Sequence, residues 1–289
     1  MDIMINNSNT SFQSARRIPN YIYTGFPDIN YLDELFQKNF DRIKELNPNY
    51  SHTIFSNSMQ VDFIEENFDK DILASYLSID ESYGAARADL FRILLLFKKG
   101  GIWLDSKSTV TSSFDRIITD SDRLVLSNWT KWNSTAVIRV HKNRNYKEIV
   151  NWFIASEPSH EILDIAIHSI LSNIRRYSPL RCGIGKKAAL CTTGPIAFTN
   201  AIHDKLNSNN HRIINSYDAG IRFTIFKTWE GHANYIPNNY RTSRRPLVHR
   251  NMFINSLVLI PVCLTFLKEF KNLIKNNSDV IIKKLRTLI

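Results

Sequence analysis

The stretch from Gly100 to Ser108, GGIWLDSKS, combines residue types that could hold an anionic ligand. Two glycines precede a short apolar run that ends at Asp105. Lys107 stands two positions later, where a second carboxylate would complete a clamp for a divalent cation. Side chains two positions apart on a strand point the same way, so Lys107 can reach the space that Asp105 faces if the strand geometry continues that far. The alternative interpretation is a strand end with ordinary surface charges.

A second pair of charged residues lies upstream, within an apolar segment. The spacing predicts a helix over Glu81–Gly101, capped by Ser82 and stopped by the glycine pair. Asp89 and Arg92 interrupt its apolar body and lie three positions apart, on one face of the helix. An ion pair within the helix is the simplest interpretation. A buried pair is unfavourable unless further groups satisfy it, however, which favours a face that looks into a polar cleft.

The elements around these residues read as an alternation of strands and helices. In the first half the pattern alternates strand and helix, which favours an α/β fold with parallel strands, and the later pieces indicate a mixed sheet. The carboxyl end of such a strand, where Asp105 falls, is where α/β sheets bind ligands. The strands expected are 17–27, 50–57, 102–105, 123–129, 135–140, 211–215 and 221–226. The other helices expected are 29–47, 61–68, 161–177 and 191–206, the last capped by Thr193 with Pro195 in its first turn.

The composition is that of a folded protein with an anionic partner. The chain has 289 residues, 43% hydrophobic and 22% charged, with a formal net charge of +10. Such a charge favours a nucleotide, a nucleic acid or an acidic membrane surface, although basic proteins are common. Three cysteines without CxxC spacing indicate a reducing compartment, and the polar N-terminal segment does not have the pattern of a signal peptide. We therefore expect a cytoplasmic protein.

The C-terminal segment differs in character from the rest. The apolar run Leu257–Leu267 is far short of the ~20 residues that span a bilayer. The region 255–289 alternates apolar stripes with lysines, so two domains are expected: 1–254 as the main domain and 255–289 as a basic amphipathic helical extension. The extension either packs on the main domain or docks on the cytoplasmic face of an anionic membrane as a peripheral anchor.

The central block YGAARADLFRILLLFKKGGIWLDSK resembles the signature of glycosyltransferase family 32, the sugar transferases with a DxD motif. More distantly it is similar to the glucosylating domains of large clostridial toxins. RIPNYIYTG, NPNYSHTIFSN and TTGPIAFTNAI resemble further family segments, so the resemblance runs from about Arg17 to Ala201. It implies a GT-A fold, a Rossmann-like mixed sheet flanked by helices, that binds a nucleotide-sugar.

The resemblance also implies roles for individual residues. Asp89 and Arg92 match residues that hydrogen-bond the donor sugar and its phosphate, and Asp105 matches an acid that contacts the ribose or the sugar. Gly101 belongs to the same donor-binding block. The opening strand at Tyr23 and Thr24 matches the neighbourhood of the base. A late histidine of the family closes on the donor, and His249 is our candidate for that catalytic role, whereas His232 is interpreted as a surface histidine.

Lys107 departs from the family pattern, which has a second aspartate there to hold a divalent cation. A departing nucleoside diphosphate gains negative charge, which a metal ion or protein cations must meet. One hypothesis is that the Lys107 ammonium replaces the metal, so that no cofactor, or only a weakly bound Mn²⁺ or Mg²⁺, is used. The other is that Lys107 points to solvent while Asp105 alone binds a metal.

The leading functional hypothesis is a retaining glycosyltransferase. It would use a nucleotide-sugar donor and a cell-surface acceptor, such as a capsule, O-antigen or lipopolysaccharide glycan that is lipid-linked at the membrane. The alternatives are a nucleic-acid-binding protein and a transferase fold that has lost catalysis. Against nucleic acid as a partner, the basic residues form no recognition helix, RNP motif or zinc finger.

Overall fold

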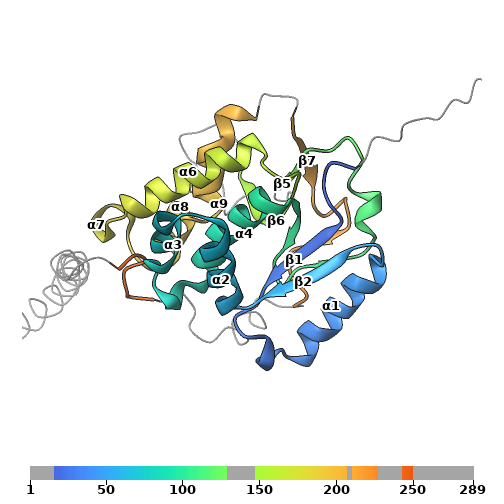
Figure 1. Cartoon of the computed structure of the whole chain (residues 1–289), viewed down its shortest axis with the longest axis horizontal. Coiled ribbons are helices and arrows are strands. Elements are labelled where there is room, and N and C mark those ends of the chain that lie inside the picture. Colours follow the sequence, from blue (N-terminus) through green and yellow to red (C-terminus); the bar gives the residue numbers. More distant parts are fainter. Residues whose placement is uncertain (1–15, 129–146, 207–209, 227–242, 250–289) are drawn as a thin grey trace, which may run out of the picture.

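A six-stranded mixed sheet lies at the centre of the molecule (Figure 1). The computed structural model describes residues 16–128, 147–206, 210–226 and 243–249. The strands of the sheet, in chain order, are β1 (Tyr21–Gly25), β2 (Ser51–Phe55), β3 (Gly101–Leu104), β5 (Leu124–Asn128), β6 (Ile149–Ser156) and β7 (Arg212–Asn215). Two short strands, β4 (Thr109–Val110) and β8 (Ile221–Arg222), form a separate antiparallel ribbon.

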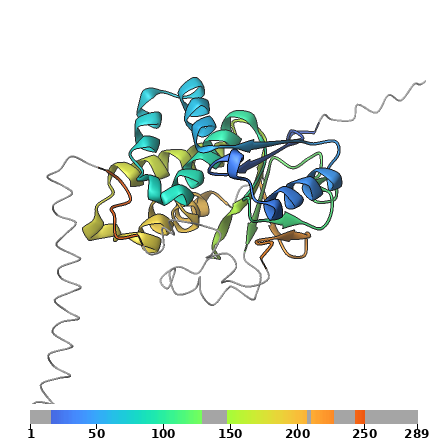
Figure 2. The ribbon, with the colours of Figure 1, turned by 90° about the horizontal axis from the view of Figure 1, so that it is seen from below.

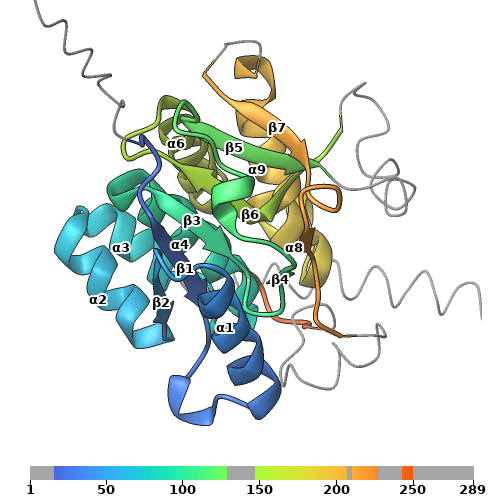
Figure 3. The same ribbon diagram turned by 90° about the vertical axis from the view of Figure 1, so that its right-hand side faces the viewer.

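The strand order is β2-β1-β3-β6-β5-β7. The first three strands are parallel, β6 runs antiparallel to both of its neighbours, and β7 is parallel to β5 (Figure 3). The carboxyl ends of β1, β2 and β3 therefore share one edge of the sheet, and Asp105 follows β3 at that edge. The α/β class and the mixed sheet expected from the sequence are confirmed.

Helices cover both faces of the sheet (Figures 1 and 2). The α-helices are α1 (Glu34–Leu46), α2 (Asn57–Asn67), α3 (Lys70–Leu77), α4 (Gly84–Lys99), α6 (Glu161–Arg175), α7 (Pro179–Cys182), α8 (Gly185–Thr192) and α9 (Pro195–Ile202). The 3-10 turns are η1 (Ile29–Tyr31), η2 (Glu81–Tyr83), η3 (Phe114–Arg116) and η4 (His203–Lys205).

The two faces of the sheet carry separate hydrophobic cores, because successive strand side chains point to opposite sides. Tyr23 and Trp103 pack in a core that includes residues of α2, α3, α4, α6, α8 and α9. Ile22 and Ile102 pack on the other side against α1 and the β4–β8 ribbon. Helix α4 is thus enclosed between the sheet and other helices, which explains its nearly continuous apolar sequence.

The start of α4 corrects one prediction, whereas its end confirms another. Ser82 is not the cap. Asp80 caps η2 by accepting a hydrogen bond from the Ser82 backbone N–H, and α4 begins only at Gly84. An acid accepts such a bond as well as a hydroxyl does, and the sequence offered both residue types within two positions. The helix ends at Gly100, as predicted from the glycine pair.

Three further differences concern elements after residue 120. Strand β6 was not predicted, although all eight of its residues are buried. The cap of α9 is Gly194 rather than Thr193, which ends α8 instead. Only Ile221–Arg222 of the expected strand 221–226 is a strand.

Some sequence predictions fall on parts of the chain that the structure does not describe. The expected strand 135–140, the extension 255–289 and His232 all lie outside the described residues. Within the described residues, no helix combines the length and the apolar character needed to cross a bilayer.

Candidate functional site

Strand β3 delivers Asp105 to the carboxyl edge of the sheet. The backbone N–H of Asp105 donates to the Trp152 carbonyl at 3.0 Å, which extends the pairing of β3 with β6 by one residue. The Trp103 indole Nε1–H donates to Asp105 Oδ1 at 3.0 Å. Trp103 and Asp105 lie two positions apart and share the face that α4 covers, so the strand's alternation sets the direction of the carboxylate.

Arg92 joins the acid on the helix to the acid after the strand. Its Nη2 atom lies 3.0 Å from Asp89 Oδ1 and 3.2 Å from Asp105 Oδ1. The side chain of Arg92 is only 3% exposed, and that of Asp89 only 10%. The predicted helical pair therefore exists, but it forms part of a three-residue network that spans two elements.

The guanidinium of Arg92 is almost fully engaged by the protein. Nη1 donates to the Asn151 carbonyl, Nε donates to the Ala88 carbonyl at 3.2 Å, and the group lies 5.3 Å from the centre of the Trp103 ring. These contacts stabilise a buried cation that two carboxylates alone would satisfy incompletely. They also leave Arg92 poorly placed to reach a ligand directly.

Lys107 and Asp105 form the exposed side of this network. Lys107 Nζ lies 3.7 Å from Asp105 Oδ2, and the two side chains are 21% and 20% exposed. The ammonium also lies 4.5 Å from the centre of the Phe223 ring, a cation–π contact. The Lys107 carbonyl accepts from the Ile225 N–H at 2.7 Å. Lys107 thus lies beside Asp105, as expected, although the strand geometry does not continue that far: β3 ends at Leu104, and the Ser108 N–H donates to the Asp105 carbonyl at 2.8 Å in a turn.

The environment of Asp89 raises the pKa of its carboxyl to about 6. Burial is the largest cause, because it penalises the charged form, and the nearby Asp105 carboxylate acts in the same direction. Arg92 opposes the shift, as do hydrogen bonds from Asn151 at 2.9 Å and Thr193 at 3.4 Å.

Three residues of this network were not predicted to act there. Asn151 lies on β6 and binds Asp89, Thr193 was expected to be a helix cap, and Trp103 was expected only as a strand residue. A signal did exist for Asn151. It is the single amide in the buried strand Ile149–Ser156, and a buried amide needs a partner.

Three expected donor-binding residues do not belong to this network, although Tyr23 pairs with Trp103 across β1 and β3. The Thr24 side chain is fully buried, with its hydroxyl 3.0 Å from His52 Nε2, and Tyr23 is only 6% exposed. Both belong to a central parallel strand, where both faces are covered. Gly101 begins β3 and so lies at the opposite end of the strand from Asp105. A Cβ there would come within 2.9 Å of the Tyr21 carbonyl, so the glycine permits strand packing rather than ligand approach.

His249 also lies apart from the network. Its Nε2 atom is 2.8 Å from Asp80 Oδ2, beside the start of α4, and its side chain is 56% exposed. Within the described part of the chain it contacts none of Asp89, Arg92, Asp105 and Lys107. The catalytic role of His249 stays a prediction.

We expect Asp80→Ala to lower the free energy of unfolding by roughly 1–3 kcal/mol, because the variant leaves the Ser82 N–H and the His249 ring without their acceptor. The Asp80 hydrogen bonds with Ser82 and the charges of His249 and Arg245 outweigh burial and lower the pKa of this carboxyl. Its contribution is therefore complete above the unfolded pKa near 4 and is lost as pH falls through the lower folded value. Urea unfolding of the wild type and the variant at pH 7 and pH 3 measures the loss of free energy and its dependence on pH. An equal effect at the two pH values would contradict this assignment.

The groups around Asp105 are mainly cationic, which disfavours a divalent cation there. The carboxylate accepts from an indole N–H and faces both a guanidinium and an ammonium, whereas Mg²⁺ is held by one or two carboxylates together with substrate phosphates. Across the described ranges, no group of three or more His, Cys, Asp or Glu side chains is placed to hold a metal ion.

The charged network lies beyond the carboxyl end of β3 in a mixed α/β sheet, which is where such sheets generally bind ligands. Residues 33–124 match the family described as the glycosyltransferase sugar-binding region containing the DXD motif. This segment holds α1 through β3 and every charged residue of the network. Residues 33–124 are thus similar to the sugar-binding region of glycosyltransferases, which confirms the resemblance found in the sequence.

Solved structures of glycosyltransferases are similar to this chain, at low identity. PaToxG glycosyltransferase is 18% identical, with 66% of this chain and 71% of that chain covered and a TM-score of 0.48. The ligand-free glycosyltransferase domain from the YGT toxin is 10% identical, with 69% and 80% covered and a TM-score of 0.45. A glycosyltransferase involved in the glycosylation of the major capsid of PBCV-1 is 11% identical, with 68% and 82% covered and a TM-score of 0.35. No curated protein matches the sequence.

Proposed function

We propose that this glycosyltransferase moves a sugar from a nucleotide-sugar donor to a glycan acceptor with retention, and that Lys107 takes the place of the divalent cation. The observation that carries the proposal is the pair of Lys107 and Asp105. The ammonium lies 3.7 Å from the carboxylate, and both are partly exposed at the carboxyl edge of the sheet. A cation and an acceptor of hydrogen bonds thus face the same space.

The chemistry requires a positive group beside the leaving diphosphate. As the bond between the sugar C1 and the phosphate oxygen breaks, negative charge grows on that oxygen, and a fixed ammonium stabilises it. The acceptor oxygen forms the new bond to C1 on the same face of the sugar. Its proton passes to the departing phosphate oxygen, so no strong protein base is needed.

The burial of each residue supports a division of roles. Asp105, which is 20% exposed, would accept hydrogen bonds from hydroxyls of the sugar or the ribose. Arg92 and Asp89 are nearly enclosed, so we assign them to positioning: Arg92 fixes Asp105, and Asp89 fixes Arg92. This departs from the direct donor contacts that the family resemblance implied for those two residues.

For the acceptor, we propose a lipid-linked glycan of the capsule, O-antigen or lipopolysaccharide type at the cytoplasmic membrane face. The net charge of +10 and the lysine-rich sequence of 255–289 support proximity to an anionic surface.

A ligand panel tests the donor assignment. Thermal unfolding of the full chain is measured with UDP, GDP, their sugar conjugates and short oligonucleotides, because a ligand that binds only the folded state raises Tm. Stabilisation by a nucleoside diphosphate is expected. Stabilisation by oligonucleotides alone would overturn the proposal in favour of a nucleic-acid-binding protein. Mass spectrometry of the stabilising donor, with and without acceptor glycans, then separates an active transferase from a fold that has lost catalysis.

A further inference from the structure

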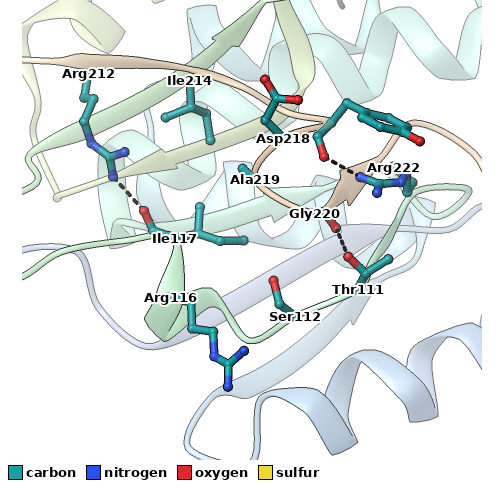
Figure 4. Close-up of a pocket in the computed structure, with 11 residues that line it drawn as sticks. Thr111, Ser112, Arg116, Ile117, Arg212, Ile214, Asp218, Ala219, Gly220 and Arg222 are labelled. Carbon is teal, nitrogen blue, oxygen red and sulfur yellow. Dashed lines mark hydrogen bonds between the residues drawn. The ribbon is translucent and has the colours of Figure 1, made fainter.

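A cavity of about 390 Å³ lies beside the β4–β8 ribbon, and we call it the ribbon pocket (Figure 4). The lining residues used below are Thr111, Ser112, Arg116, Arg212, Gly220 and Arg222. None of the network residues Asp89, Arg92, Asp105 and Lys107 lines it. The ribbon pocket is therefore separate from the proposed donor site. The two are linked by the chain, because β4 begins two residues after Lys107.

Three side chains that line the ribbon pocket, those of Ser112, Arg116 and Arg222, have hydrogen-bond donors that make no hydrogen bond with any described residue. Arg116 is exposed and its guanidinium makes no hydrogen bond or ion pair with any described residue, and the same holds for the Ser112 hydroxyl. Arg222 donates from Nη1 to the Tyr217 carbonyl at 2.7 Å and stacks 3.9 Å from the centre of that ring. These contacts orient Arg222, while its Nε and Nη2 make no hydrogen bond within the described chain.

Arg212 lines the ribbon pocket, but its positive charge is neutralised by an ion pair within the protein. It pairs with Asp122 through Nε at 2.9 Å and Nη2 at 2.5 Å, and it also donates to the Ile117 carbonyl at 2.7 Å. The carboxylate of Asp218, which also lines the ribbon pocket, points away from Ser112 in Figure 4. Arg116 and Arg222 therefore carry the positive charge available to a ligand, and in Figure 4 they lie on opposite sides of the ribbon pocket, with the Arg116 guanidinium extending away from Arg222.

Gly220 keeps the space beside the two hydroxyls open. Its φ is +80°, and a Cβ built there would lie 2.7 Å from Thr111 Oγ1 and 3.0 Å from Ser112 Oγ. Its carbonyl fixes Thr111 by accepting from the Thr111 N–H at 2.8 Å. The absence of a side chain leaves room for a ligand atom next to the Ser112 hydroxyl.

We propose that the ribbon pocket binds the phosphate monoester group of a second ligand. Guanidinium groups and hydroxyls are the side chains that hold phosphate oxygens, and the arginines can each offer paired N–H donors. The volume lies in the range of small-molecule sites and exceeds what a phosphate fills, so a small polar body attached to the phosphate also fits. The phosphate can belong to a soluble metabolite or to a lipid headgroup, since both present the same oxyanion.

The test uses the full chain and two probes. Calorimetric titration with sn-glycerol 3-phosphate measures binding of a soluble monoester. Sedimentation with phosphatidylcholine vesicles, with and without phosphatidic acid, measures binding of a lipid monoester. We expect one of the two probes to bind, and Arg116→Gln/Arg222→Gln to weaken that binding at least tenfold, because it removes two charge-assisted contacts. Ser112→Asp leaves both arginines in the sequence but introduces a carboxylate into the ribbon pocket. It is expected to weaken binding by a similar factor, because the carboxylate repels a phosphate.

Two controls keep the result specific. Arg176→Gln removes the same charge from an exposed position at the end of α6 and is expected to leave binding unchanged. Lys107→Met alters the proposed donor site and is also expected to leave binding of the probe to the ribbon pocket unchanged. The proposal is overturned if neither probe binds the wild-type chain, if Arg176→Gln weakens binding as much as Arg116→Gln/Arg222→Gln does, or if only Lys107→Met removes binding.

Discussion

Lys107→Met is expected to lower kcat for glycosyl transfer by roughly ten- to a hundredfold while the protein stays folded. One charge-assisted contact to the leaving phosphate is worth about 1.5–3 kcal/mol, which corresponds to that loss of rate. The Met side chain retains the stem that packs near Phe223 but lacks the ammonium 3.7 Å from Asp105. Initial rates with saturating donor measure the effect. Lys99→Met, at the exposed end of α4, is the matched control and should keep wild-type activity.

Chelation separates the two hypotheses for Lys107. If the ammonium replaces the metal, EDTA should leave wild-type turnover unchanged, and added Mn²⁺ should not increase it. Lys107→Asp restores a second carboxylate two positions after Asp105, so its activity should become dependent on Mn²⁺. Loss of wild-type activity in EDTA, with recovery in Mn²⁺, would instead assign Asp105 to a metal and Lys107 to the solvent.

The site residues whose position depends on a single helix or strand could be predicted from the sequence. The glycine pair, the apolar run and the strand-end acid fixed β3 and Asp105, and helical spacing placed Asp89 and Arg92 on one face. Lys107 also lies beside Asp105, but a turn after the end of β3 at Leu104, and not strand parity, brings it there. The inferences about α4 and β3 need only the period of one element, which the sequence shows directly.

The site residues whose position depends on contacts between elements far apart in the sequence could not be predicted. Asn151 approaches Asp89 because β6 inserts between β3 and β5, an order that no local pattern specifies. Thr24 shows the same limit, since its strand was predicted from local pattern but the burial of both strand faces was not. Asp80 and Ser82 are equally good cap residues two positions apart, so residue type alone does not distinguish them.

Removal of Arg92 is expected to have the largest effect on stability. Arg92→Met should lower the free energy of unfolding by about 3–5 kcal/mol, because it leaves the buried Asp89 carboxylate without its cation and removes the link to Asp105. Asp89→Asn added to Arg92→Met should recover a large part of the loss, since an amide can still bond Asn151 and carries no charge. Urea unfolding of the wild type, both single variants and the double variant gives the coupling.

The pH dependence provides an independent check on the same pair. Because the folded pKa of Asp89 is raised to about 6, the folded protein holds this proton over a range in which the unfolded chain has released it. The contribution of Asp89 to wild-type stability therefore falls as pH rises from about 4 to 6. Asp89→Asn should remove that slope, and Arg92→Met should steepen it and extend it to higher pH, because no cation then offsets the burial. A wild-type slope that Asp89→Asn leaves unchanged would mean that the pKa of Asp89 is the same in the folded and unfolded states, and that Arg92 and the hydrogen bonds offset burial in this network.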